Sequence, residues 1–413
     1  MQFNPFEIKP NALSKCFIPQ KKQYPKSYDK VNTSPFTKLR IILMNGTEFE
    51  NIFFMHNFQR HCTNNDIRRE LALIRKQEQQ QQKRIGLLKP IDESILETTI
   101  AYEQLAVELT AILAQREPDL NVKRGLDFAL LEDFDHLYRF SNLLDMEAGK
   151  DAKTYVGGLT EIMPGRPTIS EHRYPYDDVR AYTDFSKADP ITKLNTMIIT
   201  AAEQQTMNYY MNVAPFYKTE IGRKMFGEIG MIEEQHVTQY GSLLDSSVTM
   251  LECLLMHEYV ECYLYWSCAI DEEDEYIKGI WEEHLQMEIA HLHKACELLE
   301  KYEGKHYTRV IPNGTFEEPL RFGSNKEYVR KVLSSVNKTS FREEYIEVNH
   351  LPKNAEFFKY QEIVNKVASN VPSHSVINMY IQKNGEDYRY QDKPHPIKDL
   401  QDRCCDNTCI GRC

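Results

Sequence analysis

The 413-residue chain lacks any run of about 18 apolar residues, so we expect no membrane-spanning helix. Its first residues, MQFNPFEIKPNALSK, lack the basic-then-apolar pattern of a secretion signal. Basic residues are in deficit, with 50 Lys and Arg against 61 Asp and Glu and a net charge of -11. That balance argues against nucleic-acid binding and against a polybasic membrane anchor. We therefore expect a cytoplasmic protein with neither nucleic acid nor membrane as a partner.

Cysteine is neither absent nor arranged as a disulfide framework. Six of the ten cysteines are scattered singly, which favours reduced thiols. The other four crowd the last residues, DRCCDNTCIGRC, as Cys404, Cys405, Cys409 and Cys413. Their spacing departs from the paired Cys-x-x-Cys of a zinc ribbon. Metal binding, redox pairing and a disordered tail all stay open.

Long segments with apolar residues at helical spacing fill the centre of the chain and predict an all-α fold. We expect an extended arm over 1–62, a helical bundle over 63–303 and a mixed extension over 304–413. A polar segment over 149–189 is a plain crossover between helices, or a lid, or a clamp for an anionic substrate. Helices are predicted at 65–88, 93–115, 119–148, 190–213, 217–245, 247–269 and 272–303, with shorter ones near 325–336 and 355–368.

An acidic residue precedes a histidine by three positions at several places, and about two such matches are expected by chance. Three of them share further features. Each histidine is followed seven and eight residues later by Leu-Leu, which puts the histidine on an inward-facing side of its helix. Each acid follows a glutamate on the preceding helix by 30 residues. The chain thus repeats one helical hairpin three times: Glu103 with Asp133 and His136, Glu203 with Glu233 and His236, and Glu258 with Glu288 and His291.

The repeated hairpin has the chemistry of half a dinuclear metal site. A carboxylate and an imidazole three residues apart share one face of a helix. Two such hairpins supply four carboxylates and two histidines around two metal ions. Burying so many acids without cations is costly, and mixed oxygen and nitrogen ligands suit iron or manganese.

On this E…ExxH pattern, residues 93–303 resemble the ferritin-like di-iron carboxylate superfamily, which includes rubrerythrin, bacterioferritin and manganese catalase. The resemblance implies a four-helix bundle, here extended by a third hairpin, with two iron or manganese ions. It also implies an oxidoreductase that acts on a small-molecule substrate with O2 or a peroxide, and an electron donor that the sequence does not identify. The alternatives are iron storage or detoxification, and a non-catalytic scaffold with degenerate metal motifs.

Chain connectivity favours the first two hairpins as the site. The 149–189 segment is long enough to join them across a bundle, whereas the turn near Asp245 is too short to do the same for the last two. The predicted ligands are Glu103, Asp133, His136, Glu203, Glu233 and His236. Asp133 stands where the motif has Glu, and Glu132 and Asp135 are alternatives on less suitable faces.

The third hairpin supplies a second or alternative metal site made of Glu258, Glu288 and His291. It pairs with the second hairpin, or with its own copy in a homodimer, or keeps these side chains as packing. We expect a dimer on the second of these readings.

Overall fold

The computed structural model describes residues 2–162, 171–333, 338–367 and 370–385. Within these ranges the protein is mostly helical, which confirms the all-α prediction, and its one sheet is a two-stranded hairpin. The hairpin, β1 (Lys338–Phe341) and β2 (Glu344–Glu347), was not predicted. No helix in the described ranges is both long and apolar enough to cross a membrane. The cysteine-rich tail lies outside them.

The chain divides into two compact units whose segments alternate along the sequence, rather than into one bundle over 63–303. Neither unit is continuous in the sequence, because each is assembled from three separate segments. The first unit comprises Met1–Glu93, Asp184–Gln205 and Asp245–Phe322, and the second comprises Ser94–Thr183, Thr206–Leu244 and Gly323–Cys413.

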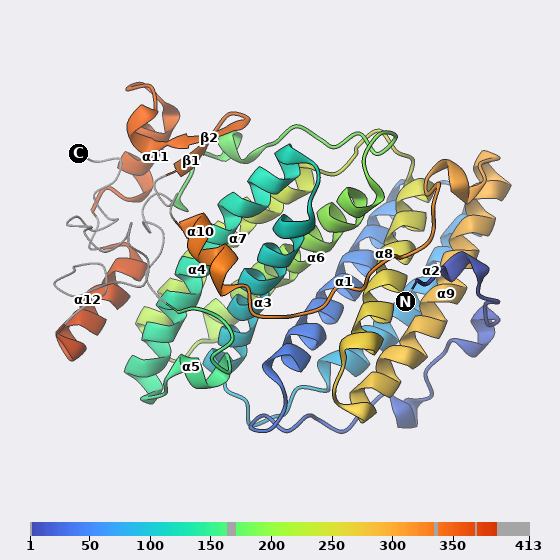
Figure 1. Cartoon of the computed structure of the whole chain (residues 1–413), viewed down its shortest axis with the longest axis horizontal. Helices are drawn as coiled ribbons and strands as arrows, with labels where there is room; N and C mark the ends of the chain where they lie inside the picture. The colour runs from blue at the N-terminus through green and yellow to red at the C-terminus, as the bar shows by residue number, and fades with distance from the viewer. Residues whose placement is uncertain (1, 163–170, 334–337, 368–369, 386–413) are drawn as a thin grey trace. The chain divides into compact units, whose positions relative to one another are not determined.

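Two helical hairpins pack together to form the first unit (Figure 1). Within it, α1 contacts α8 and α2 contacts α9, besides the contacts inside each hairpin. Short 3-10 turns before α1 lie against α9, so the segment preceding residue 35 is an ordered cover. The four long helices are α1 (Pro35–His61), α2 (Asn65–Gly86), α8 (Met250–Asp271) and α9 (Glu275–Glu303).

Helix α1 corrects the prediction of an extended arm up to residue 62. Pro35 lies in its first turn, where a backbone N–H would have no acceptor within the helix, so proline is tolerated. The helix is buried at every position from Thr37 to Met44, so its apolar residues form no single stripe. The apolar run LRIILM, with two β-branched isoleucines, resembles a strand in composition, and burial on several sides overrides that preference.

The second unit is built on α3 (Ile95–Arg116), α4 (Leu120–Ala148) and α7 (Glu220–Ser242), which agree with the predicted helices to within three residues. The division between the units falls within α6 (Pro190–Val213), after Gln205. Ser94 and Glu97 form a reciprocal capping box at the start of α3, and Gly149 ends α4 in the left-handed conformation.

The C-terminal part of the second unit packs on this core. Helix α12, which was not predicted, contacts α4 and α7, and α10 contacts α3 and α4. These helices are α10 (Lys326–Leu333), α11 (Glu356–Val364) and α12 (Pro372–Asn384); α5 (Ala152–Tyr155) lies in the crossover.

A glycine marks a close approach of α6 to α1 inside the first unit. A Cβ atom on Gly46 would lie 2.7 Å from the Cβ atom of Gln205, too close for either atom to stay in place. We predict that Gly46→Ala destabilises the protein by about 1–3 kcal/mol through overpacking. Gly279→Ala on the exposed side of α9 is the control, because nothing lies within 4 Å of its added Cβ. The control should be stabilised by about 0.5–1 kcal/mol through helix propensity. Denaturant unfolding measures both, and equal effects would contradict the close packing.

Candidate metal centre

Five of the six predicted ligands lie in the second unit and face one another. Glu103 comes from α3, Asp133 and His136 from α4, and Glu233 and His236 from α7, and none is more than 1% exposed. The sixth, Glu203, is also buried, on the part of α6 that belongs to the first unit.

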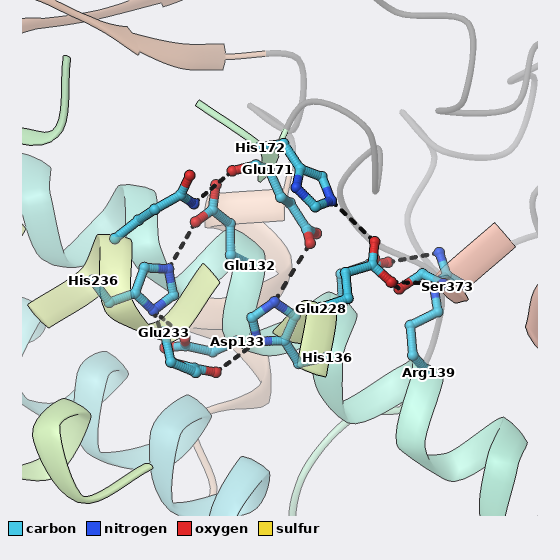
Figure 2. A network of polar contacts seen from close by, with 12 residues as sticks. Glu132, Asp133, His136, Arg139, Glu171, His172, Glu228, Glu233, His236 and Ser373 are labelled. Carbon is cyan, nitrogen blue, oxygen red and sulfur yellow. Dashed lines mark hydrogen bonds and ion pairs between the residues drawn. The ribbon is translucent and has the colours of Figure 1, made fainter. Parts of the chain in front are cut away.

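The five residues form two groups that share one carboxylate. Glu103, His136 and Glu233 each offer a ligand atom within 4.8 Å of the others, and so do Asp133, Glu233 and His236. Glu233 lies between the two imidazoles, with Oε1 2.9 Å from His136 Nδ1 and Oε2 3.1 Å from His236 Nδ1 (Figure 2). The arrangement therefore has two neighbouring positions with a common carboxylate.

Two further carboxylates hold the outer nitrogens of the histidines (Figure 2). His236 Nε2 lies 2.7 Å from Glu132 Oε2, and His136 Nε2 lies 3.4 Å from Glu171 Oε2. Each Nε2–H can donate outward, which fixes the tautomer and leaves Nδ1 directed at Glu233. Metal-binding histidines are commonly oriented in this way.

Sequence reasoning placed neither outer carboxylate. Glu132 was judged to be on a less suitable face than Asp133, yet its longer side chain reaches His236. Glu171 was assigned to the crossover, and no local pattern indicates which helix a crossover residue will meet. Asp133 itself lies 3.4 Å from His236 Nδ1 and accepts a hydrogen bond from Thr110.

The crossover is anchored by a wholly buried arginine. Arg173 donates to Glu132 and, over 2.6 Å, to Asp178. Its backbone N–H donates to Gln235 on α7, and the Gln235 amide donates to the carbonyl of Glu171. The Arg173 side chain is thus occupied by carboxylates of the protein, and it fixes the carboxylate that orients His236.

Burial sets the protonation of the cluster. It raises the pKa of Glu103 well above its usual range. Burial lowers the pKa of His136, but hydrogen bonds to Glu171 and Glu233 outweigh it and hold that pKa well above normal. Burial also opposes ionisation of Glu233, yet the two imidazoles outweigh it and keep its pKa below the usual range. The charged form of Glu233 thus depends on positive charge beside it.

The donor set fits a divalent cation. Glu103 accepts a hydrogen bond from Tyr210 through Oε1, while its buried Oε2 has no hydrogen-bond partner in the described part of the chain. Both histidine Nδ1 atoms face carboxylate oxygens, and a lone pair in that position requires a proton or a metal ion.

The third predicted hairpin belongs to the first unit, where it meets a residue that the sequence analysis did not select. His291 Nδ1 lies 2.7 Å from Glu78 of α2 and 3.2 Å from Glu288. His291 therefore has two carboxylates beside its Nδ1 atom within the first unit. Glu48 precedes Glu78 by 30 residues, the spacing seen in the other hairpins, but Gln81 stands where each of the others has histidine.

Comparison of the chain with known protein families, with curated proteins and with solved structures found no match. Functional inference therefore depends on the geometry of the described residues.

The buried arginine gives a test of the crossover. We predict that Arg173→Met lowers the free energy of unfolding by about 3–5 kcal/mol, because it leaves Glu132 and Asp178 buried without their cation. The deficit should shrink from pH 8 to pH 5, since protonation relieves the unpaired carboxyl groups at the lower pH.

Lys224→Met is the matched control, because Lys224 pairs with Glu220 on the exposed surface of α7. Its effect should stay below about 1 kcal/mol at either pH. Chemical denaturation at the two pH values measures both variants, and a small, pH-independent effect of Arg173→Met would refute its role.

Proposed function

We propose that the second unit holds a dinuclear centre of iron or manganese and acts as an oxidoreductase with O2 or a peroxide. Glu103 and His136 would hold one ion, Asp133 and His236 the other, and Glu233 would serve both. The observation that carries the proposal is Glu233, which contacts the Nδ1 atoms of both histidines while their Nε2 atoms face other carboxylates.

The chemistry of the donors supports the choice of metal. Carboxylate oxygens with imidazole nitrogens, and no thiolate, favour iron or manganese over metals that prefer sulfur. When bound, such ions supply redox chemistry with O2 or a peroxide. The likeness of the hairpin pattern to the ferritin-like superfamily supports the same class of centre.

The residues around the centre have separate tasks in this proposal. Glu132 accepts a hydrogen bond from His236, and Glu171 lies 3.4 Å from His136 Nε2, so both would keep Nδ1 directed inward. Tyr210 donates to Glu103 and holds its rotamer. Exposures of 1% or less keep bulk water from the carboxylates and strengthen their attraction for cations.

The shared carboxylate provides the test. Glu233→Gln keeps the shape of the side chain and removes its charge, so the variant should lose about two metal ions per chain while helicity is retained. Elemental analysis and circular dichroism of the purified full-length protein measure the two quantities. Glu234→Gln, one residue away on the exposed side of α7, is the control and should keep its metal.

Turnover separates the candidate functions. O2 or peroxide consumption that is lost in Glu233→Gln and kept in Glu234→Gln supports the oxidoreductase. Formation of an iron mineral in place of turnover would support storage. Equal metal content in the wild type and Glu233→Gln would overturn the centre.

A further inference from the structure

The first unit contains a second cluster of buried acids, assembled from all four of its long helices. Glu48 comes from α1 and Glu78 from α2, while α8 supplies two carboxylates and α9 a carboxylate and an imidazole. Every one of these side chains is at most 1% exposed: Glu48, Glu78, Glu258, Glu261, Glu288 and His291.

These six residues form two groups with one carboxylate in common, as in the second unit. Glu78, Glu258, Glu288 and His291 offer ligand atoms within 4.8 Å of one another, and so do Glu48, Glu78 and Glu261. Glu78 thus has the same relation to this cluster that Glu233 has to the other.

The cluster has more acceptors than donors. Glu48 Oε2, Glu78 Oε2 and Glu261 Oε1 are buried and have no hydrogen-bond partner in the described ranges. Five carboxylates face a single imidazole, and such a buried excess of negative charge is very unfavourable without cations. Two divalent cations would offset four of the five negative charges.

The imidazole is oriented as a ligand. The Gln77 amide nitrogen donates to the carbonyl of Leu13 over 2.7 Å, which turns its oxygen toward His291. That oxygen lies 2.9 Å from His291 Nε2 and accepts a hydrogen bond from it. The Nδ1 lone pair is then left facing Glu78 and Glu288.

We propose that the first unit binds its own pair of divalent cations of the iron or manganese class, at two unequal positions. One position has oxygen and nitrogen ligands, from Glu78, Glu258, Glu288 and His291. The other has oxygen ligands alone, from Glu48, Glu78 and Glu261.

The residue at position 81 makes the two proposed metal positions unequal. The helices α4, α7 and α9 each place a histidine three residues after the acid, and α2 places Gln81 there. The Gln81 amide donates to Glu288 and supplies no nitrogen ligand. Neighbours support the oxygen-only position instead: Tyr265 donates to Glu48, and Asn51 donates to Glu261 over 2.7 Å. An oxygen-only position suits hard cations and holds a transition metal less tightly than a position with imidazole.

Metal counting tests the proposal. The full-length protein, loaded anaerobically with Fe2+ or separately with Mn2+ and freed of excess, should hold about four ions per chain, two for each centre. Glu78→Gln should lower the count to about two, and Glu48→Gln should remove about one. Glu282→Gln, on the exposed side of α9, is the control and should not change the count.

The outcomes separate the two centres. A loss of two ions in Glu78→Gln and none in Glu233→Gln supports this inference while refuting the centre in the second unit. A loss in Glu233→Gln alone does the reverse and overturns the inference. If circular dichroism shows that Glu78→Gln is unfolded, Glu48→Gln and Glu261→Gln decide, and an unchanged count in both overturns the inference.

Release kinetics test the inequality of the positions. A chelator should remove one ion from the first unit of Glu233→Gln faster than the other, and Gln81→His should slow the faster phase by adding a nitrogen ligand. A single release phase that Gln81→His does not change would overturn the unequal positions.

Discussion

The carboxylate of Glu233 is buried completely, and its contacts with two imidazoles are what allow it to stay charged. The rest of the second unit follows from that requirement. Helices α4 and α7 must place His136 and His236 on either side of the carboxylate. The imidazoles then need acceptors for their outer nitrogens, which Glu132 and Glu171 provide. Each additional buried acid is a further charge that must be neutralised. The network of paired charges therefore extends from the core to the crossover.

The two units differ in the groups that surround their buried carboxylates. In the second unit, arginines close the network: Arg173 binds Glu132, and Arg139 lies 3.0 Å from Asp135. In the first unit, amides of Asn51 and Gln81 donate to the acids of the cluster. Amides are neutral donors. They satisfy the hydrogen-bonding capacity of the carboxylates but leave their negative charge unbalanced. On the proposal of two metal centres, the first unit should therefore depend more strongly on a bound cation than the second.

The sequence predicted the helices with a polar face well, because their apolar periodicity and caps are local features. It failed for α1, whose burial on several sides hides any periodicity. The candidate site residues also divide into those that a local pattern reveals and those that it does not. Asp133, His136, Glu233 and His236 were found because their spacing is local and repeated. Glu171 and Glu132 were not, since their roles depend on how a crossover folds back and on the reach of a side chain. Glu78 was hidden by Gln81, although the 30-residue spacing from Glu48 was available.

The alternation of the two units along the chain sets an order of synthesis. Glu258 follows Glu78 by 180 residues, so the first unit cannot close its core until most of the second has left the ribosome. At about 5–20 residues per second, the α1–α2 hairpin waits on the order of ten to forty seconds for α8. The residues from Glu103 to His236 all emerge within that interval. A nascent chain therefore exposes the acidic face of Glu48 and Glu78 while the later-emerging half of their cluster is still being made.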